Sequence, residues 1–176
     1  MKAVWWILTV ALTLASVVVL ALGVRQLDAA PTPAAAGLSG PAATPPPAAD
    51  SAQRRNEVQK FGREAAVRLL SYTPQSAQRE LTAAGEELTT GAFKDRFTKL
   101  INQVVIPGAT AKQIRSEAQV PAIAVESLDT DTATLIAFID QSVTIGTEEP
   151  TNTTSSVRMG LEKVGKSWLV ATFDPL

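Results

Sequence analysis

An uncharged apolar run near the start of the sequence constrains this chain more than any other feature. The run, "AVWWILTVALTLASVVVLALGV", covers the 22 residues Ala3–Val24 and is flanked by Lys2 and Arg25. A helix of that length spans about 33 Å, which is enough to cross a bilayer core of about 30 Å. The sequence therefore predicts an N-terminal membrane anchor over residues 1–27, with the transmembrane helix in the lipid bilayer at 3–24.

The topology of the anchor follows from its flanks. The segment before the run is too short to fold, so we expect the amino terminus in the cytoplasm and the rest of the chain outside the cell membrane. A cleaved signal peptide is the alternative, because Ala21–Gly23 and Ala29–Ala30 resemble cleavage sites. The run is longer than the roughly 7–15 apolar residues of a signal peptide, which favours an uncleaved, single-pass anchor in the inner membrane.

A spacer rich in alanine and proline follows the anchor. Residues 28–50, "DAAPTPAAAGLSGPAATPPPAAD", contain nine Ala and six Pro. Each proline removes a helical hydrogen bond and restricts the residue before it. We expect a semi-rigid linker that forms no packed element and reaches at most ~70 Å when fully extended.

Residues 51–176 are predicted to form one folded domain, because apolar residues recur there at regular spacing. The first helix is expected at 51–73. The second opens at Thr73–Pro74 and closes near Gly85, and the third covers 89–108, where Pro107–Gly108 ends it. The apolar residues expected to face the core from these helices are Val58, Phe61, Ala65, Leu69, Ala77, Leu81, Phe93, Phe97, Leu100, Ile101 and Val104.

The apolar period changes to two after residue 112, which predicts four antiparallel strands. The strands are expected at 113–128, 131–146, 156–164 and 167–173, with a polar loop at 146–155 and a hairpin turn at Gly165–Lys166. Helices followed by strands predict an α+β fold, in which about three helices pack on one face of a curved four-strand antiparallel sheet.

Three of the predicted strands carry more specific expectations. Pro121 indicates that the first strand is an edge strand or contains a bulge. Ile136 and Phe138 add apolar surface to the second face of their strand, which predicts that the middle of this strand is covered on both sides. In the last strand, the alternation places Leu169, Ala171 and Phe173 on one face and Trp168 and Val170 on the other.

The composition argues against several classes of function. Lys and Arg number 16 against 17 Asp and Glu, so no basic surplus suggests a nucleic-acid partner. The chain contains no histidine and no cysteine, which removes the usual general base, the commonest metal ligand and any thiol nucleophile. "DTDTA" at 129–133 begins like a calcium loop but lacks its later ligands. We therefore expect no cofactor and no metal.

Several stretches resemble the actinobacterial Mce-associated membrane proteins, which are accessory to the mammalian-cell-entry (Mce) lipid transporters. They are "AAVRLLSYTPQSAQRELTAAGEELTTGAFKDRF", "AFIDQSVT" and "VRMGLEKVGKSWLVATFDPL", within Arg54–Leu176. Members usually read Tyr-Asp where this chain has Tyr72–Thr73. The resemblance implies a cystatin-like cone of the nuclear-transport-factor-two type. It also implies a non-enzymatic role in assembling or stabilising an envelope lipid or sterol importer, whose protein subunits would be the partners. Related cones often pair, so a homodimer is a further expectation.

Two polar residues deserve testing for cavity chemistry, Tyr72 at a helix junction and Asp140 after a strongly apolar strand. A base and a hydroxyl converging inside a cone would suit an isomerase or dehydratase. The simpler interpretation is that Tyr72 packs and Asp140 is solvated, so no residue is predicted to be catalytic. The candidate cavity or packing positions are Tyr72, Phe97, Phe138, Asp140, Trp168 and Phe173. An anchored lipid or sterol carrier that uses the cone cavity is the alternative function.

Overall fold

The structure is a computed structural model and describes residues 48–176. The predicted anchor at 3–24, its topology and most of the 28–50 linker lie outside these residues. Within 48–176, no helix combines the length and the apolar character that a membrane crossing requires. The predicted α+β class is confirmed, because three helical segments pack on a four-strand antiparallel sheet.

The first described helix, α2, covers Ala48–Leu70 and begins slightly before the predicted linker boundary at residue 50. It presents Val58, Ala65 and Leu69 to the core as the periodicity predicts, with Phe61 half-buried beside them. Gly62 lies where α2 passes closest to the sheet, because an added Cβ there would collide with Leu135. The apolar stripe therefore fixes which side of α2 meets the sheet.

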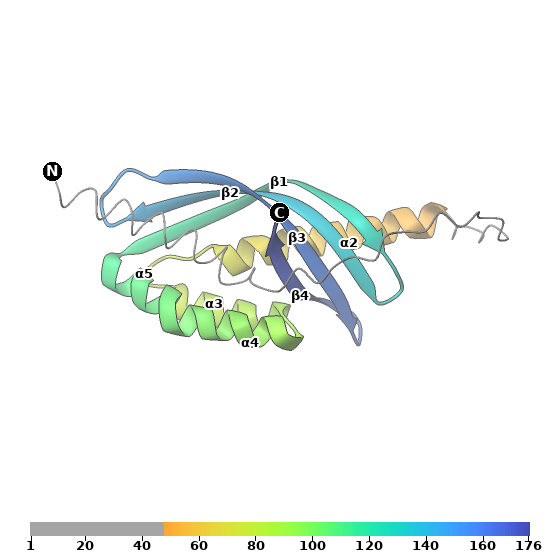
Figure 1. The fold of residues 1–176 in the computed structure, drawn as a ribbon, viewed down its shortest axis with the longest axis horizontal. Helices are drawn as coiled ribbons and strands as arrows, with labels where there is room; N and C mark the ends of the chain where they lie inside the picture. The colour runs from red at the N-terminus through yellow and green to blue at the C-terminus, as the bar shows by residue number, and fades with distance from the viewer. Residues whose placement is uncertain (1–47) are drawn as a thin grey trace, which may run out of the picture.

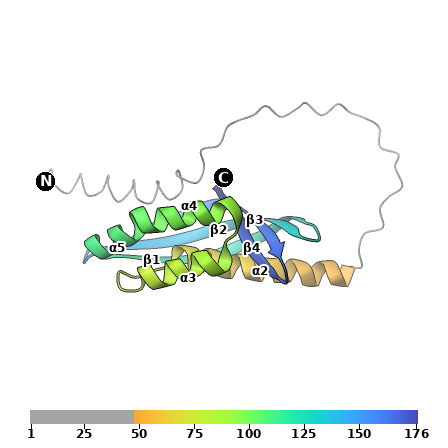
Figure 2. The same cartoon turned by 90° about the horizontal axis from the view of Figure 1, so that it is seen from below.

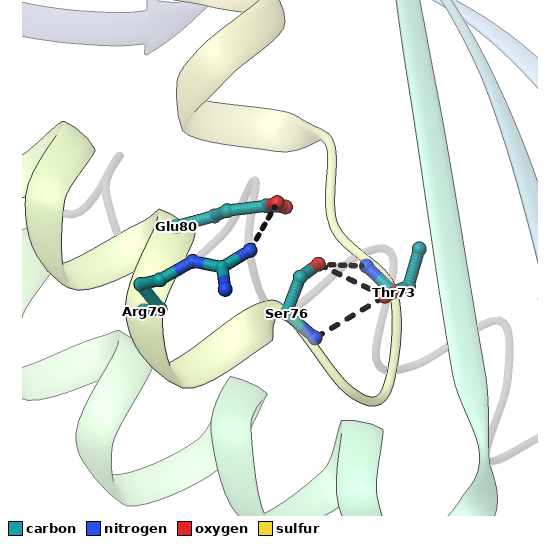
Figure 3. A network of polar contacts seen from close by, with 4 residues as sticks. All are labelled: Thr73, Ser76, Arg79 and Glu80. Carbon is teal, nitrogen blue, oxygen red and sulfur yellow. Dashed lines mark hydrogen bonds and ion pairs between the residues drawn. The ribbon is translucent and has the colours of Figure 1, made fainter.

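The second helix, α3, covers Ala77–Leu88 and starts later than predicted. The prolyl turn before it is organised by Thr73 and Ser76 (Figure 3). The Thr73 N–H donates to Ser76 Oγ at 3.0 Å, and the Ser76 N–H donates to Thr73 Oγ1 at 3.2 Å. These reciprocal bonds resemble a capping box with serine in place of the usual glutamate, and they satisfy two backbone donors before the helix proper begins. Arg79 and Glu80 form an exposed ion pair in the first turn.

The third helical segment continues past Pro107, so the predicted stop there is wrong. It consists of α4 (Gly91–Leu100), a π-helical turn η1 (Ile101–Val105) and α5 (Ile106–Lys112). The wider turn lies just before the proline and relieves the clash that its ring would make with the carbonyl one turn earlier. It also inserts one residue into the apolar stripe, which is why Val105 is buried and Val104 is only half-buried. The segment ends at Gln113, whose φ of 54° reverses the chain.

Four strands follow in the order β1-β2-β3-β4, each antiparallel to its neighbour. Their bounds are Ile114–Leu128 (β1), Thr132–Ile145 (β2), Thr151–Val164 (β3) and Ser167–Pro175 (β4). Figures 1 and 2 show the helices on one side of the curved sheet. The predicted loop at 146–155 is shorter in the structure, because β3 already begins at Thr151.

Irregular pairing occurs at three places, one of them between Val125 and Ser127 of β1. The register of β1 and β2 shifts between Gln119 and Ala122, around Pro121, and β1 is an edge strand, so both expectations for that proline are confirmed. In β4, Ala171 has no partner, because Gly160 pairs with Thr172 and Leu161 pairs with Val170. This bulge returns Phe173 to the face of Val170, so the strict alternation predicted for the last strand is wrong.

The core lies between the helices and the inner face of the sheet. Ala133, Leu135, Ala137 and Ile139 of β2 are buried in it, as the alternation predicts. Phe138, on the outer face of β2, is 49% exposed. The expectation that β2 is covered on both sides is therefore wrong, because among residues 48–176 no layer packs against the outer face.

Candidate functional site

Two of the candidate aromatic residues lie close to a third aromatic ring inside the domain. The ring centroid of Phe93 is 6.0 Å from that of Phe97 in α4 and 6.3 Å from that of Phe173 in β4. All three side chains are buried. Aromatic pairs at such distances contribute about 0.5–1.5 kcal/mol beyond the apolar area that they bury. The space between α4 and β4 is thus filled with protein.

Trp168 lies in β4 and is also buried. Its indole Nε1–H donates to Glu57 Oε1 of α2 at 3.2 Å, and the Lys163 ammonium lies 5.6 Å from the ring centroid. A buried indole N–H requires such an acceptor. Trp168 therefore fastens α2 to the β3–β4 hairpin.

Tyr72 lies where α2 meets the edge of β1. Its backbone N–H and C=O exchange two 2.9 Å hydrogen bonds with Ser116. The Ser116 hydroxyl is buried, donates to Leu70 O at 2.7 Å and accepts from Gln141 Nε2 at 2.7 Å. Burial raises the pKa of the Tyr72 phenol above its ordinary value of 10.0. A raised pKa keeps the phenol neutral near pH 7, as suits a packed side chain.

Asp140 and Phe138 lie on the outer face of β2, away from the aromatic residues. Asp140 is exposed, and its Oδ1 accepts a 2.7 Å hydrogen bond from Thr154 Oγ1 on β3. The structure therefore separates Asp140 from the interior that holds Phe97, Trp168 and Phe173. Within the described part of the chain, no group of three acidic side chains is placed to hold a metal ion.

A groove lined by residues of the helical layer is a feature that the sequence analysis missed. It lies between α3 and the α4–η1 segment and has a volume of about 600 Å³. Its rim carries both charge signs, from Glu86, Lys94, Asp95 and Lys99, while Ile101 contributes apolar surface. Thr82 also lines it, with a hydroxyl that is buried and makes no hydrogen bond to the described residues. The alternation of charge in "FKDRFTK" was the available signal, but a solvated helix face carries the same pattern.

The chain is similar in sequence to mycobacterial proteins. The outer membrane protein Rv1973 of Mycobacterium tuberculosis H37Rv is 39% identical over 127 residues, which cover 72% of this chain and 79% of the relative. The chain belongs to the Rv1973 family. A second relative, the uncharacterized protein Rv1362c of the same organism, is 33% identical over 111 residues, which cover 62% of this chain and 50% of the relative. No general family model matches the sequence.

Solved structures show that the Rv1973-family domain shares its fold with proteins of type IV secretion systems. An IcmL-like protein from Legionella pneumophila superposes with a TM-score of 0.59 at 9% identity, covering 69% of this chain and 91% of its own. The periplasmic domain of DotI superposes with a TM-score of 0.58 at 17% identity, covering 69% of this chain and 94% of its own. CagV, a VirB8 homologue from Helicobacter pylori, superposes with a TM-score of 0.55 at 15% identity, covering 67% of this chain and 95% of its own. The predicted cone-shaped fold is thereby confirmed, and these likenesses concern the fold alone.

The candidate residues of this Rv1973-family domain thus divide into three groups. Phe97, Trp168 and Phe173 fill the interior, and Tyr72 joins α2 to β1. Phe138 and Asp140 face outward. The α3–α4 groove adds a surface with mixed charge, which can contact a polar partner without catalysis.

Proposed function

We propose that this protein is a non-enzymatic, membrane-anchored accessory protein of the cell envelope that assembles or stabilises an Mce-type lipid or sterol importer. The observation that carries the proposal is the 39% identity to a protein named for the outer membrane. The fold, which resembles periplasmic domains of secretion machinery, supports an extracytoplasmic position. The motifs within Arg54–Leu176 that resemble Mce-associated proteins are the reason for proposing an Mce-type complex. The apolar run at 3–24 is the reason for proposing an inner-membrane anchor.

The packed interior supports an assembly role over the alternative lipid carrier. A lipid tail needs a roomy apolar cavity of several hundred Å³. The aromatic cluster of Phe93, Phe97 and Phe173 occupies the region between α4 and β4 where such a tail would insert. The groove of about 600 Å³ lies instead on the helical surface and has a charged rim. We assign to this groove the contact with an importer subunit.

The proposal is tested by affinity capture of the full-length chain from detergent extracts of its native membranes. Importer subunits, identified by mass spectrometry, are expected to co-purify, and deletion of 3–24 is expected to reduce their recovery. Recovery of no envelope protein by the intact chain would overturn the proposal. Fractionation of the membranes tests the anchor: the intact chain is expected in the inner-membrane fraction.

A matched pair of variants tests the groove. Lys94→Glu with Lys99→Glu reverses both cations of the groove rim, whereas Lys60→Glu with Lys166→Glu makes the same charge change at exposed positions elsewhere. The groove variant is expected to lose the importer subunits while the control retains them. Equal recovery with both variants would exclude the groove as the contact. Lipid uptake is expected to be unchanged by Asp140→Asn and Tyr72→Phe, since neither residue is assigned a chemical step.

A further inference from the structure

The outer face of the sheet has an exposed apolar centre. Phe138 of β2 lies there, 49% exposed, with Ala122 of β1 directly opposite it. The next pair along the same face is Ala124 and Ile136. Figures 1 and 2 show the helices on the other side of the sheet, and within residues 48–176 no element covers this face. An uncovered apolar centre with a polar surround is typical of a docking surface.

Acidic side chains surround this centre. The charged residues on the outer face of the strands are Arg115, Arg158, Glu117, Glu126, Asp140, Glu162 and Asp174. Arg158 forms an ion pair with Glu126 at 3.0 Å. Arg115 lies 3.6 Å from Glu117. The other three carboxylates form no ion pair with any described residue, so the outer face is acidic and its cations are already engaged.

Two of the unpaired carboxylates lie on either side of Ser156, a small residue directly opposite Phe138. Asp140 of β2 pairs with the β3 residue two positions before Ser156, and Asp174 of β4 pairs with the residue two positions after it. Two strand spacings across the sheet and four residues along it separate these carboxylates by ~16 Å. Three turns of an α-helix rise by about the same distance, ~16 Å.

The acidic character of the outer face decides which occupant suits it. A second copy that binds through the same face opposes like charges. The negative surface potential of anionic lipids repels an acidic surface. The chain's own segment 28–47 contains no lysine and no arginine, so it offers no cation to the free carboxylates. Charge complementarity therefore favours a cationic segment of another protein.

We propose that the outer face of the sheet binds a cationic amphipathic helix of a partner protein. Lysine or arginine side chains about three turns apart on that helix pair with Asp140 and Asp174. An apolar side chain between them packs on Phe138, in the manner of a helix that lays its apolar stripe on a receptor surface. The inference does not depend on the proposed importer, because it uses a different surface from the α3–α4 groove.

A labelled synthetic helix tests the charge of the occupant. The lysine probe carries two lysines about 11 residues apart and leucines between them on the same face, and the control peptide has glutamate in place of both lysines. Fluorescence anisotropy with the full-length chain in a non-ionic detergent measures Kd, after subtraction of binding to detergent alone. We expect the lysine probe to bind at least ~10-fold more tightly than the control, with a smaller difference at ~1 M salt. Equal binding of the two peptides would overturn the proposal.

Matched variants locate the binding on this face. Asp140→Lys with Asp174→Lys reverses both free carboxylates, whereas Glu148→Lys with Glu149→Lys makes the same charge change between β2 and β3. The first pair is expected to weaken binding of the lysine probe at least ~10-fold and the second less than ~3-fold. Phe138→Ala is expected to weaken it at least ~5-fold. Equal effects of the two charge variants, or unchanged binding by Phe138→Ala, would refute the site. Far-UV circular dichroism checks that each variant is folded.

A photocrosslink at the same position identifies the natural occupant. Benzoylphenylalanine in place of Phe138, in the full-length chain in its native membranes, is expected to crosslink to a segment of another protein with a net positive charge. Asp140→Lys with Asp174→Lys is expected to lower the yield at least ~5-fold. A crosslink to lipid, to a second copy or to residues 1–47 would contradict the proposal, as would no crosslink. Lys94→Glu with Lys99→Glu, which tests the importer contact, is expected to leave the yield unchanged, so the two proposals can fail separately.

Discussion

Substitution of Gly62 by alanine tests how closely α2 packs on the sheet. An added Cβ would lie well inside van der Waals distance of Leu135 Cδ1, 3.1 Å from Ile123 Cδ1 and 3.6 Å from Met159 Sδ. Leu135 and Met159 are completely buried, so their side chains have little room to yield. Overpacking of this kind costs about 1–3 kcal/mol. Alanine regains about 1 kcal/mol through its higher helix propensity. We expect a net loss of about 1 kcal/mol in the free energy of unfolding.

Gly108→Ala is the matched control for this prediction. Gly108 lies in α5, where an added Cβ would be 4.0 Å from Ile114 Cδ1. With no clash, the substitution is expected to stabilise the domain by up to about 1 kcal/mol. Urea unfolding followed by circular dichroism measures both changes. Leu135→Val shortens the side chain that an alanine at position 62 would meet. In that background, the loss of unfolding free energy caused by Gly62→Ala should therefore be smaller by at least about 0.5 kcal/mol. A Gly62→Ala variant as stable as Gly108→Ala would refute the packing argument.

Three further predictions concern the aromatic residues and one turn. Phe93→Ala should lower the free energy of unfolding by about 3–5 kcal/mol, while Phe138→Ala, at a half-exposed ring, should lower it by less than about 1 kcal/mol; urea titration measures both. Tyr72 is the only tyrosine, so its ultraviolet titration should show one inflection above pH 10. Because the folded pKa is raised, the stability contribution is complete below pH 10 and is lost as the pH rises through the folded value, a loss that Tyr72→Phe should abolish. Gly165→Ala should cost about 1 kcal/mol in thermal unfolding, because its φ of 64° is left-handed.

Periodicity predicted the element types because each element buries one regular face. Val58, Ala65 and Leu69 in α2, and Leu135 and Ile139 in β2, lie where the spacing places them. Two of the misses occur where the backbone gains a residue. One extra residue is present in the π-helical turn before Pro107 and another in the bulge at Ala171. Each changes the face on which the following side chains of the same segment lie, and the spacing of apolar residues in the sequence did not predict either change.

The candidate site was less predictable, because its exposure depends on the tertiary arrangement. Phe138 and Phe97 are the same residue type in apolar stretches of sequence, yet only Phe97 is buried. The alternation in β2 predicted its buried face, but whether a second layer covers the opposite face, where Phe138 lies, cannot be read from the local pattern. The groove between α3 and α4 depends on the approach of two helices whose charged residues resemble any solvated surface.

The way in which α2 covers the β1 edge has an evolutionary consequence. Gln59 donates to Ile123 O at 3.3 Å, and Arg63 donates to Val120 O, so both side chains bind main-chain oxygens. A carbonyl is supplied by whichever amino acid occupies the position, so drift in the outward-facing part of β1 leaves these bonds intact. The donors are side chains, so replacement of Gln59 or Arg63 by a residue without a long donor removes the bond. Relatives of this protein should therefore diverge at the exposed positions of β1 while keeping long hydrogen-bond donors on α2.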